Sequence, residues 1–169
     1  MTDAPGFAVA CRQVSDARPP FGLRVDVTLL LHAMQRAETG RGMDRSLDAD
    51  VYEALGWDVV RRPTARRRMG WQFRSPLSLR WHDLPSPSSD VQASSMLAPW
   101  RWSWLVGMDC GQPWARCYTR DMGGMSSEAR RLTLARSMLS AALDAQRQSL
   151  QIPDAFLAAD PIAVGARHA

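Results

Sequence analysis

A histidine followed by an aspartate, His82 and Asp83, is the pair of residues in this sequence best suited to acid–base chemistry. An imidazole titrates near neutral pH, and a carboxylate beside it can orient the ring. The pair lies in the segment SPLSLRWHDLPSPSS, whose prolines and serines are typical of a loop. Neighbouring residues of a loop need not face one site, and no nucleophile elbow, glycine-rich phosphate loop or metal-ligand cluster accompanies them. A small hydrolase or transferase is therefore the least supported hypothesis. We expect that the protein is not an enzyme and that it binds no cofactor and no metal.

Five arginines occur within the eight positions from 61 to 68, where they could contact the phosphates of a nucleic acid. The alternative is a solvated loop between a helix and a strand. All 21 basic residues of the chain are arginine, with no lysine and no asparagine, which indicates a GC-rich genome and weakens the case for nucleic acid. The 17 acidic residues leave a net charge of +4, which favours an anionic partner only slightly. The candidate nucleic-acid-binding residues are Arg61, Arg62, Arg66, Arg67 and Arg68.

Four of the seven tryptophans lie in the stretch WRWSWLVGMDCGQPWARCY, residues 100–118. Apolar residues at every second position from 100 to 108 predict a strand, and DCGQ and PWARCYTR predict a turn and the returning strand of a hairpin. The tryptophans could form the inner face of this hairpin, a platform for stacked bases with Arg101 and Arg116 at the backbone, or part of a protein interface. We expect the inner face, because each indole buries about 150–250 Å². Three bare indoles would exceed the apolar patch that soluble monomers usually expose.

Other tryptophans and arginines are candidates for a protein interface, since these two residue types are the usual anchors of such surfaces. The candidate interface residues are Trp81, Trp114 and Arg116.

The chain has three cysteines, Cys11, Cys110 and Cys117, an odd number that favours reduced thiols. In the predicted hairpin Cys117 lies opposite Trp104 while Cys110 lies in the turn, so the two thiols cannot form a disulfide. Their spacing matches no common zinc pattern, and no histidine is near. An acidic residue and no basic segment precede the chain's first short apolar stretch, so we expect no signal peptide. No apolar run approaches the roughly 18 residues of a membrane span. These features predict a cytoplasmic protein with no membrane association.

The remaining pattern predicts the elements that position these residues. A helix ends near Gly40, a second begins at the cap Ser46 and ends at Gly56, and the last is capped by Ser126 or Ser127 with Leu132 in its buried stripe. The predicted helices span residues 25–40, 46–55, 88–98 and 126–149, and the predicted strands are 69–74 and the hairpin of 100–120.

This order of elements predicts an α+β fold, similar to an α-β-α sandwich, with a small, largely antiparallel sheet covered by helices. We divide the chain into an N-terminal leader with one helix (residues 1–45), an α+β sandwich domain (46–150) and a C-terminal tail (151–169). The sequence leaves open whether the N-terminal helix packs on the domain or exchanges with a neighbouring molecule, and it leaves the oligomeric state open.

Three segments together resemble the phage α-β-α sandwich domain family: LDADVYEALGW (47–57), LPSPSSDVQAS (84–94) and ARSMLSAAL (135–143). In that family a short helix ends in Gly-Trp, a proline-rich loop leads to a Ser-x-Asp helix start, and a hairpin and an alanine-rich helix follow. This chain departs from the pattern at Pro87 or Ser88, where the family usually has an aromatic residue. The resemblance covers residues 46–147 and implies a phage or prophage origin. The family has no established activity, so the resemblance names no site residues.

These observations lead to a non-enzymatic phage or prophage accessory protein that binds another protein, a component of host defence or of the virion, in the cytoplasm of the host cell. The alternative function is nucleic-acid binding through the arginine cluster and nearby aromatic residues.

Overall fold

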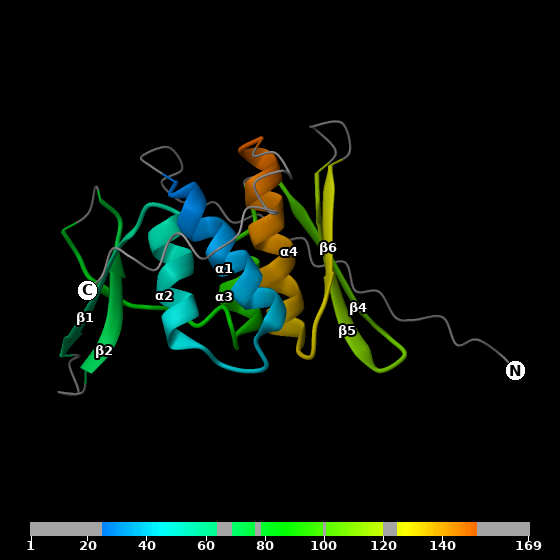
Figure 1. Cartoon of the computed structure of the whole chain (residues 1–169), viewed down its shortest axis with the longest axis horizontal. Coiled ribbons are helices and arrows are strands. Elements are labelled where there is room, and N and C mark those ends of the chain that lie inside the picture. The colour runs from blue at the N-terminus through cyan, green and yellow to red at the C-terminus, as the bar shows by residue number, and fades with distance from the viewer. Residues whose placement is uncertain (1–24, 64–68, 77–78, 100, 120–124, 152–169) are drawn as a thin grey trace, which may run out of the picture.

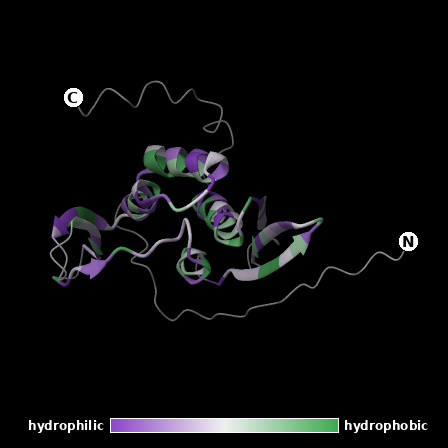
Figure 2. Cartoon of the chain, turned by 90° about the horizontal axis from the view of Figure 1, so that it is seen from below, coloured by the Kyte–Doolittle hydropathy of each residue, from purple (hydrophilic) through white to green (hydrophobic). Residues whose placement is uncertain are grey.

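The computed structural model describes residues 25–63, 69–76, 79–99, 101–119 and 125–151. Within these ranges the helices lie between two small sheets, an order that is visible from two directions (Figure 1 and Figure 2). The helices are α1 (Val27–Thr39), α2 (Arg45–Ala54), α3 (Val91–Ser95) and α4 (Leu134–Ser149). The strands are β1 (Asp58–Pro63), β2 (Met69–Arg74), β3 (His82–Asp83), β4 (Ser103–Asp109), β5 (Gln112–Tyr118) and β6 (Ser126–Arg130).

Both sheets are antiparallel and have three strands, in the orders β1-β2-β3 and β4-β5-β6. The predicted α+β class, in which helices pack against small antiparallel sheets, is therefore confirmed. The sequence predicted one sheet, and the described residues form two. The difference arises at Asp58–Pro63, where we predicted only a turn near Pro63 and the structure has strand β1. Proline is tolerated there because it ends an edge strand, where its missing N–H breaks no ladder hydrogen bond.

Residues 126–130 form strand β6 and not the first turn of the last helix, as the sequence predicted. Ser127 and Ala129 are buried and their neighbours exposed, which is the alternation of a strand that has one face on the core. Helix α4 begins later, after Thr133, whose hydroxyl accepts a hydrogen bond from the N–H of Arg136 at 3.3 Å. Leu132, predicted to be buried, therefore lies before the helix and is 63% exposed.

Two helices begin at an aspartate where the sequence suggested a serine. Asp44, and not Ser46, caps α2 by accepting from the N–H of Leu47 at 3.0 Å. Asp90 caps α3 by accepting from the N–H of Gln92 at 2.8 Å, so this helix starts later than the predicted Ser88 or Ser89. Serine and aspartate both serve as N-caps, and the spacing alone does not choose between neighbouring candidates.

The predicted end of α2 is confirmed in detail. Gly56 adopts a φ of 87°, and the N–H groups of Gly56 and Trp57 bond to the carbonyls of Glu53 at 2.9 Å and Tyr52 at 3.0 Å. This pair of bonds is a Schellman motif, which satisfies the last carbonyls of the helix. It turns Trp57 back onto the ring of Tyr52, with centroids 6.0 Å apart.

The core lies between the helices and extends to both sheets. Helix α1 contributes Leu30 and Ala33, which are fully buried together with Leu139 and Leu143 of α4. Small residues such as Ala142 let these helices approach closely. Helix α1 thus packs into the same core as the region after residue 46.

The tryptophan-rich stretch forms the hairpin of β4 and β5. Trp102 and Trp104 are 6% and 4% exposed, so these two indoles belong to the core, as the burial argument predicts. Trp104 lies opposite Cys117 in the predicted register. Cys110 and Gly111 have φ angles of 47° and 78°, as a type I′ turn requires, and Cys110 is exposed while Cys117 is buried, both as free thiols. Residues 1–24 and Trp100 lie outside the described residues, so Cys11 has no structural account.

Arg136 is 1% exposed, which makes it the largest fully buried side chain of the described residues. Its Nε donates to the carbonyl of Gly42 at 3.0 Å, and its guanidinium lies directly beneath Gly40, just after the end of α1. Burial lowers the pKa of this guanidinium, while the carboxylates of Asp44 and Asp48 oppose that shift. The side chain therefore joins α4 to the loop that follows α1.

Candidate functional site

The two faces of the β1-β2-β3 sheet separate the arginine cluster, because successive residues of a strand point to opposite faces. Arg61 lies opposite Trp71 and Arg62 lies opposite Gly70. The face of Arg61 also carries Phe73, which packs on Tyr52 of α2 with ring centroids 5.0 Å apart, and we call it the inner face. Arg62 therefore lies on the outer face. The other members of the cluster, Arg66, Arg67 and Arg68, lie outside the described residues.

The outer face carries Trp81 with two arginines over its ring. The guanidinium carbons of Arg62 and Arg74 lie 4.4 Å and 4.7 Å from the ring centroid. We call these three residues the arginine–tryptophan face. The indole is half-buried, and each guanidinium over it contributes about 0.5–1 kcal/mol at an exposed site of this kind. A candidate interface residue and a candidate nucleic-acid-binding residue thus lie together, with an arginine that the sequence did not single out.

The charge of the arginine–tryptophan face is only partly neutralised. Arg74 donates from its Nε to Asp58, directly opposite on β1, at 2.8 Å. Arg62 makes no ion pair with a carboxylate of any described residue. The N–H groups at the edge of a stacked guanidinium remain able to donate, and they match the geometry of a carboxylate or phosphate. The face therefore offers an aromatic ring together with a guanidinium, that of Arg62, which has no carboxylate partner among the described residues.

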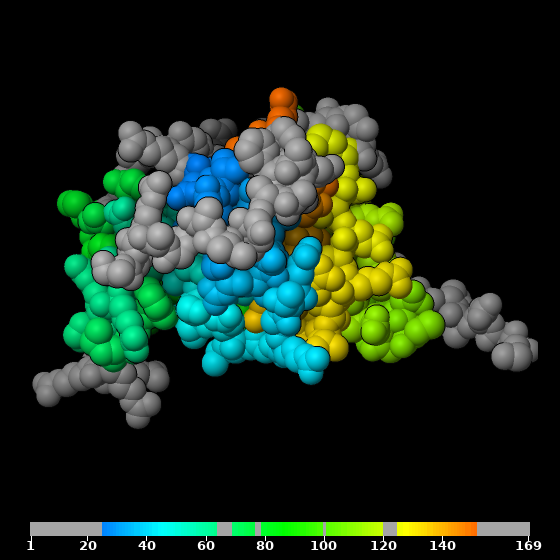
Figure 3. All heavy atoms as spheres, in the orientation of Figure 1, coloured from blue at the N-terminus to red at the C-terminus, as the bar shows by residue number. Residues whose placement is uncertain are grey.

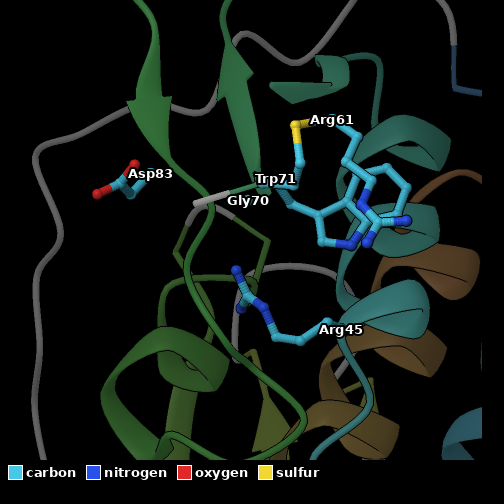
Figure 4. A pocket seen from close by; sticks show the side chains of 6 residues that line it. Arg45, Arg61, Gly70, Trp71 and Asp83 are labelled. Atoms are coloured by element: carbon cyan, nitrogen blue, oxygen red, sulfur yellow. The ribbon is translucent and has the colours of Figure 1, made fainter. Parts of the chain in front are cut away.

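A pocket of about 440 Å³ lies at the edge of the same sheet, between β2 and the start of α2 (Figure 4). Arg61 is exposed at this pocket, and its side chain makes no hydrogen bond or ion pair with a described residue. The lining residues are Arg45, Arg61, Met69, Gly70, Trp71 and Asp83.

Arg45 forms one wall of the pocket and is held in place by the loop after β3. Its guanidinium donates to the carbonyls of Leu84 at 2.7 Å and Pro85 at 2.8 Å, and to the hydroxyl of Ser86. It also pairs with the fully buried carboxylate of Asp48 at 3.1 Å. Arg45 therefore has a structural role at the pocket, and its charge is paired with that of Asp48.

Three aspartates of the loop before α2 and of α2 itself differ in pKa. Burial raises the pKa of Asp48, although the N–H of Ser88 and the charge of Arg45 oppose the shift. Burial also raises the pKa of Asp50, against the opposing charge of Arg36. Asp44 behaves differently: burial disfavours its charge, but hydrogen bonds from the helix N-terminus, from a serine hydroxyl and from Arg36 lower its pKa to about 2. These carboxylates hold α2, Arg36 and the loop after β3 together.

His82 and Asp83 do not form a catalytic pair in this structure. They are successive residues of β3, so their side chains lie on opposite faces, and both are exposed. The His82 ring packs near Phe73, with centroids 6.0 Å apart, while Asp83 accepts a long hydrogen bond of 3.5 Å from Gln72. Asp83 lines the pocket and His82 does not. Within the described ranges, no three histidine, cysteine, aspartate or glutamate side chains are placed to hold a metal ion.

The other two candidate interface residues, Trp114 and Arg116, lie on β5 in the second sheet. Arg116 forms an ion pair with Glu128, directly opposite on β6. Trp114 is half-buried over Gly107, where an added Cβ would lie 2.8 Å from the indole. Both side chains thus have partners within their own sheet. Figure 3 shows the two sheets at opposite ends of the molecule, so one flat surface does not join these residues to Trp81.

The sequence did not single out Arg74 or the pocket residues Arg45, Met69, Gly70 and Trp71 as site residues. Strand parity does place Arg74 and Gly70 on one face of the predicted strand 69–74. No local pattern, however, indicates that Trp81 folds back over that face.

None of the helices in the described ranges is both long and apolar enough to cross a lipid bilayer. Comparisons of the chain with protein-family models, with curated proteins and with solved structures found no match.

Proposed function

We propose that the protein is a non-enzymatic binding protein whose arginine–tryptophan face contacts another protein. One observation carries this proposal: Trp81 is half-buried with the guanidinium groups of Arg62 and Arg74 over its ring, and Arg62 has no carboxylate partner among the described residues. Tryptophan and arginine dominate the binding energy of protein interfaces, where they act as preorganised anchors. A complementary partner would supply a carboxylate for Arg62 and apolar surface for the indole.

The chemistry of the face favours a protein over a nucleic acid. A nucleobase that stacked on Trp81 would compete for the indole with the guanidinium groups of Arg62 and Arg74, which already lie over the ring. Arg61 and Arg62 also point to opposite faces, so they cannot follow one phosphate backbone together. A carboxylate does not compete for the indole, because it approaches the edge of the guanidinium.

We place this binding protein in a phage or prophage, acting in the host cytoplasm on a component of host defence or of the virion. That setting rests on the sequence resemblance described above, and the partner class rests on the arginine–tryptophan face.

The test is a quantitative pull-down from a lysate of a bacterium with a GC-rich genome, with three forms of the full chain as bait. The wild type and Arg116→Ala should recover the same protein in stoichiometric amount. Trp81→Ala should lose it, with affinity reduced at least about tenfold, as for an interface anchor. Arg116 is the matched control because it is an exposed arginine on the other sheet. The proposal is wrong if no stoichiometric protein is recovered, or if all three baits recover it equally.

Nucleic-acid binding is the second candidate, because Arg61 and Arg62 are exposed and continue into three further arginines in the sequence. An oligonucleotide titration at two salt concentrations separates this candidate from the first. Binding through phosphates weakens steeply with salt, with a slope that reports the number of contacts. No binding, or binding insensitive to salt, would exclude it.

A further inference from the structure

Strand β2 has an open backbone edge at its first residues. β1 pairs with β2 along its whole length, but β3 pairs only with Gln72 and Phe73. The N–H of Leu84 makes one further bond, to the carbonyl of Trp71 at 3.0 Å. Before Trp71, residues 69 and 70 have no partner strand among the described residues on this side. The pocket lies at this open edge.

The cause of the open edge is the path of the chain after β3. Arg45 binds the carbonyls of Leu84 and Pro85 and draws this segment toward α2. The buried carboxylate of Asp48 fixes the segment further by accepting from the N–H of Ser88 at 2.8 Å. Proline at position 85 has no N–H to donate to a neighbouring strand. The gap between β2 and the loop is therefore a fixed feature of the fold.

We call the pocket at this open edge the groove; it combines apolar surface with a guanidinium that has no acidic partner among the described residues. Trp71 and Met69 supply the apolar surface, and Met69 is 57% exposed. The charge of Arg45 is matched by Asp48, whereas Arg61 has no acidic partner among the described residues. Figure 4 shows the carboxylate of Asp83 directed away from the other labelled side chains. A segment that binds here would meet backbone donors and acceptors, an indole and one free guanidinium.

We propose that this groove binds an extended acidic segment of the protein partner, added as a short strand beside Met69 at the start of β2. Main-chain hydrogen bonds to the open edge give such a strand its affinity, and alternate side chains give it specificity. Arg61, Met69 and Trp71 lie on one face of the sheet. A carboxylate of the segment therefore pairs with Arg61, and the apolar side chain two positions away, on the same face of the segment, covers Trp71 and Met69. This inference rests on the proposed function, and it adds a second contact at the sheet edge, distinct from the arginine–tryptophan face.

The test uses a synthetic peptide, acetyl-Glu-Thr-Val-Thr-Glu-amide, whose glutamates and valine share one face of a strand. This peptide and its lysine counterpart are titrated into the 15N-labelled full chain. The glutamate peptide should shift the amide signals of Met69, Gly70 and Trp71 and slow the hydrogen exchange of the Met69 N–H. Arg61→Glu should weaken this binding at least about tenfold, the effect of losing about 1.4 kcal/mol. Arg62→Glu changes the same charge on the same strand but on the other face, and it should weaken binding by no more than about twofold.

Three results would overturn the inference: no binding of the glutamate peptide up to about 5 mM, equal binding of both peptides, or equal effects of the two arginine variants. Arg61→Gln checks that the loss comes from the missing cation and not from an added repulsion. Its thermal unfolding should match the wild type, because Arg61 is exposed. The proposed function is tested separately, by the pull-down with Trp81→Ala. If the groove binds no acidic peptide, this inference is wrong, but the proposal for the arginine–tryptophan face is not affected.

Discussion

Tryptophan and arginine occur in both sheets, at Trp104 and Arg116 in one and at Trp81 and Arg62 in the other. In the β4-β5-β6 sheet the indole of Trp104 is buried, and its Nε1 donates to the carbonyl of Ser95 at 3.1 Å. Arg116 in that sheet is paired with Glu128. In the β1-β2-β3 sheet the indole is half-buried and Arg62 has no carboxylate among the described residues. The same residue types therefore complete a core in one sheet and leave unmatched charge in the other.

Strand pairing shows the same contrast. β4 and β5 pair over seven residues each, and β6 covers the other edge of β5 with five. β3 covers only two residues of β2. A sheet whose central strand is partly open is suited to contact a partner, and one whose central strand is paired along most of both edges is suited to support the fold.

The largest expected effect separates the two tryptophans. Trp104→Ala should lower the free energy of unfolding by about 3–5 kcal/mol, because it removes a buried indole and leaves a cavity. Trp81→Ala should cost no more than about 1–2 kcal/mol, since its ring is half-exposed and loses mainly the two guanidinium contacts. Urea denaturation of both variants measures the difference. Equal losses would mean that the outer face of the β1-β2-β3 sheet is as structural as the hairpin.

The next effect is a pH dependence of stability, which should differ between the two sheets because the helices packed against them have different N-caps. Helix α2, which carries the β1-β2-β3 sheet, is capped by Asp44, and α4 is capped by Thr133, which does not titrate. The pKa of Asp44 is lowered from 3.8 to about 2, so its stabilisation is complete above pH 4 and is lost as the pH falls toward 2. Asp48 works in the opposite sense: its raised pKa makes the folded state take up a proton first, so its contribution rises as the pH falls toward 4.

The protection factors of the backbone amides, which correct for the intrinsic pH dependence of exchange, should therefore fall more in β1 and β2 than in β4 and β5 between pH 4 and pH 2.5. Asp44→Asn keeps a capping acceptor without the titration and should remove most of this difference. Asp44→Ala should lower stability at pH 7 by about 1–2 kcal/mol, the usual cost of a lost cap. An equal fall of the protection factors in both sheets would show that they unfold as one unit.

A smaller effect is expected at the turn of the hairpin. Gly111 has a φ of 78°, which costs a residue with a Cβ about 1 kcal/mol, so Gly111→Ala should lower stability by that amount. Gly42→Ala is the control, because a Cβ there meets no atom within 4 Å and the residue has no positive φ. Thermal unfolding should show a lower Tm for the first variant only. An unchanged Tm for both would mean that the turn does not limit the stability of this sheet.

The smallest effect is expected for Arg116→Ala. Both members of its ion pair with Glu128 are partly exposed, and such pairs are worth less than about 1 kcal/mol. The variant should unfold close to the wild type and should keep the partner in the pull-down. A loss of the partner would move the interface to the other end of the molecule, where the sequence had also placed candidates.

Local patterns predicted strand β2 and the hairpin of β4 and β5. Strand 69–74 has the predicted bounds, and the hairpin places Trp104 opposite Cys117 as expected, because period-two patterns and short turns fix the register. Residues 126–130 were wrongly assigned to a helix, since Ser-Ser-Glu before an apolar stripe is also the pattern of a helix start. These residues form a strand and not a helix start because they pair with β5, a contact that lies outside the segment.

The site was predictable only residue by residue. Arg62 and Trp81 were each candidates, but the sequence places them 19 positions apart and gives no sign that the ring lies under the guanidinium. The separation of Arg61 from Arg62 follows from strand parity, and it was missed because β1 was not recognised. The pocket depends on Arg45 binding the carbonyls of a distant loop, which no local pattern records.

The glycine that ends α1 limits how this helix can dock. A Cβ at Gly40 would lie 2.7 Å from the guanidinium of Arg136, which is itself fixed by the Gly42 carbonyl. Each residue of a helix advances the axis by about 1.5 Å and turns by about 100°. A slip of α1 by one residue would thus bring the side chain of Thr39 or Arg41 into that space. The close approach of Gly40 to Arg136 therefore disfavours such a slip and fixes the register of α1 against α4.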